Sequence, residues 1–221
     1  MSTREMFAAG GIVMWPLLLL SVLVLILTVE RAVFWLRIRQ RQRPLIRRVL
    51  LLYRDQPAEA VALLKKSVGL PVARIFLEAL EVKDASSYQF RLALEGASHA
   101  EMPLLKRFSS VFQTVIAIAP LLGLLGTILG LIRSFGAVRI GEMGANAGAV
   151  TGGISEALVS TAVGMVVAIF ALTAFNIFRS CYRRQISLLQ EYSSQLEILY
   201  DQQRREYSSY LERESYASAQ R

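Results

Sequence analysis

Residues 119–135 read Ala-Pro-Leu-Leu-Gly-Leu-Leu-Gly-Thr-Ile-Leu-Gly-Leu-Ile-Arg-Ser-Phe. At helical spacing the small and hydroxyl-bearing residues share one face, while leucine and isoleucine occupy the others. The residues on that face are Gly123, Thr127, Gly130 and Ser134. In a membrane helix, small residues let a neighbouring backbone approach closely, and a hydroxyl places a polar group at membrane depth. This stretch therefore predicts a membrane helix with one tightly packed, partly polar face.

A second stripe of the same kind occurs in residues 157–171. Its members follow the helical period and are Ala157, Thr161, Gly164, Ala168 and Ala171. Two matching stripes indicate either a seam that only packs helices or a pathway that the helices line. At this point both interpretations stay open.

Composition places the chain among membrane proteins. It has 221 residues, of which 54% are hydrophobic and 19% charged, with one Cys and one His. Runs without charge cover residues 7–29, 108–132 and 157–178, and each is about 30 Å or more long as a helix, enough to cross a bilayer. We predict an all-α integral membrane protein with three transmembrane helices that are extended by long cytoplasmic helices.

Charge sets the expected topology. Of the 25 Lys and Arg residues, 22 lie between the first two spans or after the third, and the positive-inside rule places those regions in the cytoplasm. The predicted segments are an outer N-terminus (1–11), a first span (12–35), a cytoplasmic helical region (36–107), a second span (108–134), a short outer loop (135–153), a third span (154–178) and a cytoplasmic helical tail (179–221). The formal charge of +8 then reflects topology and attraction to anionic lipids. Nucleic-acid binding is not expected, because no aromatic platform is interleaved with the basic residues.

The cytoplasmic parts carry local helix signals. We expect short helices over 58–66 and 72–82, a turn with an N-cap at 84–87, and then a long helical segment in which Pro103 can introduce a kink. An amphipathic helix should continue the third span into the tail, with its last 15 or so residues frayed.

Enzyme chemistry has no support in the residues present. With His99 as the only histidine, neither a histidine metal cluster nor a Ser-His-Asp triad can form within one chain. Residues 123–130 also lack the Lys-Ser/Thr of a phosphate loop. We predict no enzyme activity, no cofactor and no metal.

No Asp, Glu, Lys, Arg or His lies near the middle of any predicted span. A proton relay normally needs an ionisable group at that depth. The chain can therefore line a proton path only if a second protein supplies the acid; otherwise it does not conduct. Thr127 and Thr161 have two open roles: a hydrogen bond back to their own helix, or orientation of water or a partner's carboxylate. Glu156 stands at the outer entry of the third span.

Residues 119–132 and 153–164 resemble the second-span and third-span signatures of the ExbB/TolQ/MotA proton-channel family, and the first span is similar to those of ExbB. The family resemblance implies a homo-oligomeric ring, a pentamer, around a dimer of an ExbD-like single-span partner whose aspartate carries the proton. It also implies an inner-membrane location with a periplasmic N-terminus and a cytoplasmic C-terminus. Many relatives have proline after the Val-Ala-Ile of the third span, whereas this chain has Phe170, so a straighter helix is expected there.

The resemblance implies roles for particular residues. Those on the proton pathway are Thr127, Thr161 and Glu156, and those that pack helices are Gly123, Gly126, Gly130, Gly164 and Ala168. The implied function is a proton-channel subunit that uses proton motive force to drive TonB-dependent-type transport or another envelope process, with a TonB-like protein and membrane lipids as further partners. The alternatives are a TolQ-like envelope-maintenance motor subunit and a structural membrane scaffold without conduction.

Overall fold

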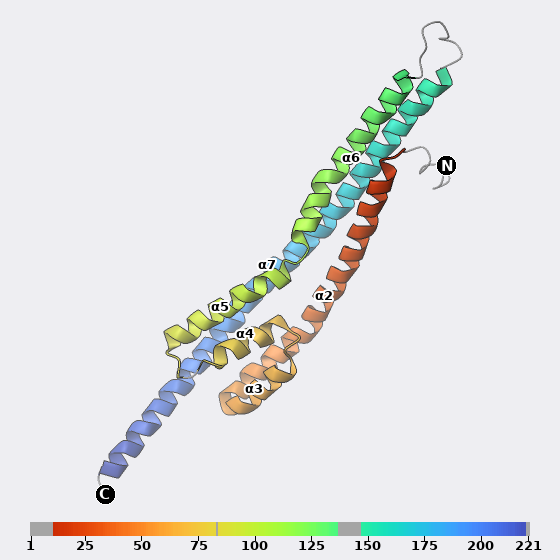
Figure 1. Cartoon of the computed structure of the whole chain (residues 1–221). Helices are drawn as coiled ribbons and strands as arrows, with labels where there is room; N and C mark the ends of the chain where they lie inside the picture. Colours follow the sequence, from red (N-terminus) through yellow and green to blue (C-terminus); the bar gives the residue numbers. More distant parts are fainter. Residues whose placement is uncertain (1–10, 83, 137–146, 220–221) are drawn as a thin grey trace. The chain divides into compact units, whose positions relative to one another are not determined.

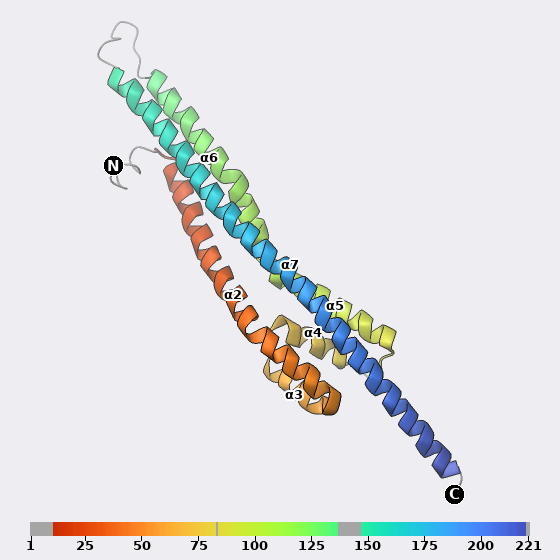
Figure 2. The same ribbon diagram turned by 180° about the vertical axis from the view of Figure 1, so that it is seen from behind.

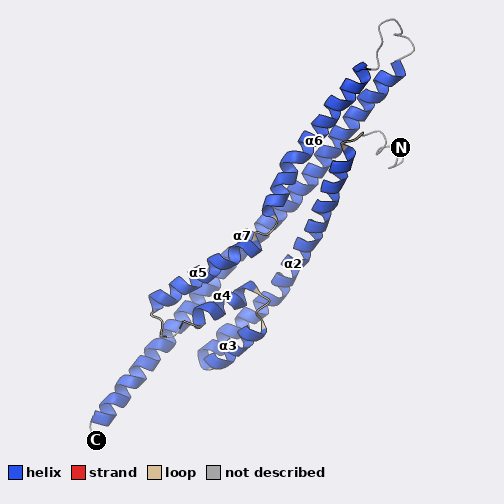
Figure 3. Cartoon of the chain, in the orientation of Figure 1, coloured by secondary structure: helices blue, strands red, loops and turns tan. Residues whose placement is uncertain are grey.

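The computed structural model describes residues 11–82, 84–136 and 147–219, and within these ranges Figure 3 shows helices and connecting turns without a strand. The helices are α2 (Met14–Asp55), α3 (Pro57–Lys66), α4 (Pro71–Leu80), α5 (Ser87–Leu105), α6 (Ser109–Gly136) and α7 (Ala147–Ala219). Three stretches are long and apolar enough to cross a membrane, in α2, in α5 with α6, and in α7. The all-helical fold with three candidate spans is thus confirmed, while the ring remains a prediction. The expected outer segments 1–11 and 135–153 lie largely outside the described residues.

The chain folds into two compact units. The first contains the start of α2, all of α6 and the first part of α7, within the ranges Met1–Ala32 and Arg107–Arg179. The second contains the rest of α2, helices α3 to α5 and the rest of α7, within Val33–Lys106 and Ser180–Arg221.

The first unit has a core of apolar and small side chains. In Figures 1 and 2, α6 runs alongside the first part of α7 in both views. The buried cluster comprises Val13, Met14, Leu17, Val24 and Leu27 of the α2 segment, Phe112, Val115 and Ala119 of α6, and Val167, Ala168, Ala171 and Ala174 of α7. By contrast, Leu19, Leu121 and Leu158 are 63–70% exposed. Large aliphatic side chains on the outer faces fit helices that face lipid or other protein rather than water.

An arginine is buried in the first unit, near the end of its α2 segment. Arg31 is 2% exposed, and its Nε and Nη2 atoms donate to the two carboxylate oxygens of Glu30 at 2.6 and 2.9 Å. Its guanidinium also lies over the ring of Phe108, 5.4 Å from the centroid. The carboxylate of Glu30 and the face of the Phe108 ring both stabilise the buried positive charge of Arg31.

The second unit begins its helices where the sequence predicts. Proline occupies the first turn of both α3 and α4, a position whose missing N–H costs no intrahelical bond. Ser86 caps α5 and forms a capping box with Gln89. The expected helices 58–66 and 72–82 are observed as Pro57–Lys66 and Pro71–Leu80, so these local predictions are confirmed to within two residues.

Two local expectations are wrong. The segment that leads to the second span is not continuous, because a turn at residues 106–108 separates α5 from α6, and Phe108 in that turn adopts a positive φ of 66°. The tail does not fray within the described residues, because α7 extends to Ala219. An i,i+4 ion pair between Asp201 and Arg205, 2.8 Å between Oδ2 and Nη2, supports that extension.

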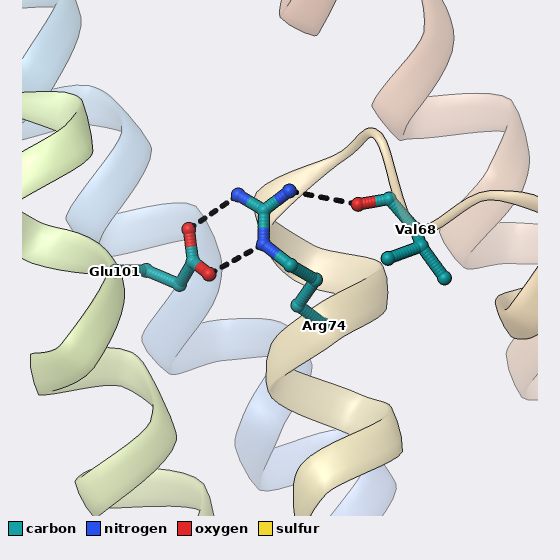
Figure 4. Close-up of polar contacts among 3 residues, drawn as sticks. All are labelled: Val68, Arg74 and Glu101. Carbon is teal, nitrogen blue, oxygen red and sulfur yellow. Dashed lines mark hydrogen bonds and ion pairs between the residues drawn. The ribbon is translucent and has the colours of Figure 1, made fainter.

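Arg74 ties α4 to α5 in the second unit. Its Nε and Nη2 atoms donate to the carboxylate oxygens of Glu101, both at 2.5 Å, and Nη1 donates to the carbonyl of Val68 at 2.7 Å (Figure 4). The Glu101 carboxylate raises the pKa of the Arg74 guanidinium above its ordinary value. The two-pronged geometry fixes both distance and orientation between the two helices.

Three further contacts join α7 to the rest of the second unit. Gln185 donates to Gln42 on α2 at 2.8 Å, and both side chains are buried. The Tyr200 hydroxyl donates to the carbonyl of Ala85 at 2.9 Å, while its ring stacks on Phe90 with centroids 4.0 Å apart. Because each contact is specific for one partner, together they define the register of α7 in this unit.

Candidate functional site

The two small-residue stripes face each other within the first unit. On α6 the buried residues along this face are Gly123, Gly126, Gly130 and Ser134, whereas Thr127 is partly exposed. On α7 the buried residues along this face are Ala157, Ser160, Gly164, Ala168 and Ala171, whereas Thr161 is partly exposed. Leucine side chains on the other faces of the two helices are exposed, for example Leu124 on α6 and Leu158 on α7. The structure thus brings the two stripes of the sequence into one seam.

The seam is closed so tightly that two glycine positions have no room for a side chain and a third has very little. A Cβ at Gly126 would overlap the hydroxyl of Ser160, and one at Gly164 would lie 2.6 Å from the carbonyl oxygen of Ala119. A Cβ at Gly123 would lie 3.0 Å from the backbone of both Ser160 and Thr161. Glycine at these positions lets the two backbones meet directly.

Thr161 makes a hydrogen bond across the seam. Its Oγ1 donates to the carbonyl oxygen of Gly123 at 3.0 Å. The neighbouring Ser160 is 0% exposed and donates to Ala157 on its own helix at 2.8 Å, with the Gly123 carbonyl 3.4 Å away. One carbonyl of α6 therefore faces two hydroxyls of α7.

Thr127 makes a different contact. Its Oγ1 donates to the carbonyl oxygen of Leu124 within α6, at 2.6 Å. This is the bond back to its own helix that a threonine in a membrane helix commonly makes. Thr127 and Thr161 are both partly exposed, whereas Ser160 is fully buried.

The other residues singled out in the sequence are placed as follows. Gly130 is buried on α6, where its carbonyl accepts a bond from Ser134 at 2.8 Å. Ala168 is 8% exposed in the core of the first unit. Phe170 is 46% exposed and lies within the uninterrupted helix α7.

Glu156 belongs to α7 by its backbone, and its side chain lies outside what the structure describes. The pathway roles of Thr127, Thr161 and Glu156 stay predictions.

Ser160 is the seam residue that the sequence interpretation did not assign a role. It follows Ala157 by three positions and precedes Gly164 by four, so it occupies the same helical face as both. Its helical spacing from Ala157 and Gly164 could have identified it from the sequence as a residue of the packed face. Its full burial against Gly126 depends on how α6 packs against α7, which the sequence of one helix does not show.

The seam offers hydrogen-bonding groups but no titratable one. The uncharged runs 108–132 and 157–178 contain no Asp, Glu, Lys, Arg or His, and no cluster of potential metal ligands occurs among the residues that the structure describes. Hydroxyl and carbonyl oxygens can orient water or an acid, but neither group changes its protonation state near neutral pH. The groups of the seam therefore do not exchange protons near neutral pH.

Known proteins resemble this chain in sequence over the region that carries both stripes. Residues 67–191, which include both stripes, match the model of the MotA/TolQ/ExbB proton channel family. The chain is 57% identical over 193 residues to a biopolymer transport protein named ExbB-like 3 of Synechocystis sp., covering 87% of this chain and 92% of that one. It is 40% identical over 196 residues to ExbB-like 1 of the same organism, covering 88% and 77%. An ExbB homolog of Methanothermobacter thermautotrophicus is 27% identical over 175 residues, covering 78% and 61%.

Proposed function

This chain belongs to the MotA/TolQ/ExbB proton channel family, and from that premise we propose that it is the channel subunit of an ExbB-type energiser complex. The names of its relatives are those of ExbB proteins, which favours this type over a TolQ-like motor. In this role the protein uses proton motive force to drive transport of the TonB-dependent type or another process of the envelope.

The observation that carries the proposal is a hydroxyl-lined seam without an acid. Thr127 and Thr161 offer oxygen atoms within candidate spans, and no ionisable side chain lies in the middle of any uncharged run. A proton therefore needs a carboxyl group from another chain to cross at that depth. A dimer of an ExbD-like single-span protein, with an aspartate in its span, supplies it.

The remaining parts of the proposal follow from charge and family. Several copies of the chain, five on the family pattern, surround the partner dimer, with Thr127 and Thr161 facing it and Glu156 near the outer mouth. The complex lies in the inner membrane with the N-terminus periplasmic and the basic regions 36–107 and 179–221 cytoplasmic. A TonB-like protein receives the resulting movement.

The test is proton flux in vesicles that contain the chain together with a single-span protein from a neighbouring gene. Thr161→Val and Thr127→Val should each leave assembly intact and abolish flux, because valine keeps the shape of threonine without its oxygen. Thr173→Val is the matched control, since the exposed Thr173 donates to Ile169 of its own helix at 2.8 Å. Flux should persist in that control.

A packing-only scaffold is the competing function, and the bond of Thr127 back to its own helix favours it. The scaffold predicts that both threonine variants are silent and that Gly126→Leu alone disrupts assembly. Normal flux in Thr127→Val and Thr161→Val would therefore reject the proposed pathway, and absence of flux with the unaltered chain would reject conduction altogether.

A further inference from the structure

Helices α5 and α7 border a cavity within the second unit. The two helices lie side by side in both ribbon views (Figures 1 and 2), and Phe90 of α5 stacks on Tyr200 of α7 with ring centroids 4.0 Å apart. The cavity has a volume of about 330 Å³ and is lined by residues of these two helices alone. That volume lies in the range of sites that hold small organic molecules.

One hydroxyl at the cavity has no hydrogen-bond partner. Ser193 of α7 lines the cavity, and its buried Oγ atom bonds to no described residue. Two other serines of the lining differ, because Ser98 donates to the carbonyl of Leu94 at 2.7 Å and Ser194 to that of Gln190 at 3.1 Å. A buried polar group without a partner is unfavourable and calls for one. Ser193 can supply it as acceptor or donor.

Two carboxylates of the lining have no counter-charge. Glu95 projects from α5 and Glu197 from α7, and both line the cavity. The ion pairs among the residues that the structure describes include neither of them. Each carboxylate therefore keeps its acceptor sites for a ligand.

The arginine of the lining does not neutralise these carboxylates. The guanidinium of Arg91 lies over the ring of Tyr88, 5.4 Å from the centroid. Tyr88 precedes Arg91 by three residues, whereas Glu95 follows it by four, so the guanidinium is directed along α5 away from Glu95. With His99 counted as neutral, the two carboxylates and the one guanidinium leave the lining with a net charge of −1. The cavity thus favours a cation.

We propose that this cavity binds an aliphatic diamine, a methylene chain with an ammonium group at each end. An ammonium group has three N–H donors and no acceptor, so one end can donate to Glu95 and the other to Glu197, with Ser193 as a further acceptor. The methylene groups fit the apolar part of the lining. A small metal ion has the charge but would leave that apolar surface in contact with water. The apolar residues are Leu94, Met102, Ile186 and Leu189.

The experiment measures the Kd of diaminoalkanes by isothermal titration calorimetry. The purified full-length chain is kept in a neutral detergent without phospholipid, so that no anionic headgroup binds the probe. We expect 1,5-diaminopentane to bind more tightly than 1,3-diaminopropane, by up to about fourfold for each added methylene that is buried. Mg²⁺ at the same ionic strength should not displace the diamine.

The variants assign binding to the cavity. Glu95→Gln and Glu197→Gln should each weaken the binding of 1,5-diaminopentane about two- to fivefold, as for a partly exposed ion pair. Ser193→Ala should weaken it about two- to tenfold through one lost hydrogen bond. Glu206→Gln is the matched control, since it removes an exposed carboxylate of α7 that does not line the cavity, and its Kd should not change. Thermal unfolding without diamine establishes that each variant is folded.

Three results would overturn the inference. The first is that no diamine binds to the full-length chain, which is also the result if a second copy of the chain covers the cavity. The second is a Kd that does not depend on the number of methylenes, because the chain would then recognise charge alone. The third is an equal loss of affinity in Glu206→Gln and Glu95→Gln, because the attraction would then come from the overall charge of the protein.

Discussion

The hydroxyl of Thr161 on α7 donates to the carbonyl oxygen of Gly123 on α6, 3.0 Å away. This bond joins the two stripes that the sequence shows separately. Hydrogen bonds between membrane helices contribute about 0.6 to 2 kcal/mol each, so the bond by itself does not hold the unit together. Its consequence is geometric, because it joins a side chain of α7 to the backbone of α6 at the point where Gly123 lets the two helices approach closely.

Enlarging a glycine in the seam should weaken the first unit. Gly164→Ala places a Cβ 2.6 Å from the carbonyl oxygen of Ala119, and the backbone must shift at a cost of about 1–3 kcal/mol. The measurement is thermal unfolding of the purified protein in detergent. Gly152→Ala is the control, because nothing lies within 4 Å of a Cβ there. Equal stability of the two variants would show that the seam is looser than described.

Replacing one glutamine of the buried pair Gln42 and Gln185 should lower the free energy of unfolding more than replacing both. Gln185→Leu leaves the amide of Gln42 buried without its bond, which should cost about 1–3 kcal/mol. In the double variant Gln42→Leu/Gln185→Leu, two apolar groups face each other and much of the stability should return. A double-mutant cycle in urea measures the coupling. Additive losses would contradict a direct interaction between the two side chains.

The Arg74 contact should depend on guanidinium geometry as well as charge. Arg74→Lys keeps the positive charge but cannot make both bonds to Glu101 and the third to Val68, so the midpoint of thermal unfolding should fall. Arg205→Ala is the comparison: its side chain is 81% exposed in an i,i+4 pair with Asp201, so this change should hardly alter the midpoint of thermal unfolding. A Lys variant as stable as the unaltered protein would contradict the prediction.

Strongly alkaline pH should destabilise the second unit through Tyr53. This residue lies beyond the first predicted span, and burial raises the pKa of its hydroxyl from 10.0 to about 12. The unfolded chain releases that proton first, so the stabilising contribution is complete below pH 10 and is lost as the pH rises toward 12. Ultraviolet absorbance of tyrosinate against pH measures it. Tyr53→Phe should remove the latest-titrating component, and an unchanged titration would refute the assignment.

Local patterns predicted much of what the structure contains. Charge-free runs identified the three candidate spans, and the helices expected over 58–66 and 72–82 and the N-cap expected at 84–87 lie within two residues of the observed helix starts. The signals for helix starts lie within one helical turn of the first residue of each helix. The break at residues 106–108 was missed, because the positive φ of Phe108 is not the preference of a phenylalanine.

For the seam between α6 and α7, the sequence pattern and the tertiary structure each determine different features. By itself the sequence determined the two stripes, their threonines and the absence of an acid at membrane depth, because helical period and composition are properties of a single segment. Only the tertiary structure decided that Thr161 donates to Gly123 while Thr127 donates within its own helix, and that Ser160 is buried. The partner of a hydroxyl depends on which atoms of another helix approach it, and that approach is set by side-chain packing between segments far apart in the chain.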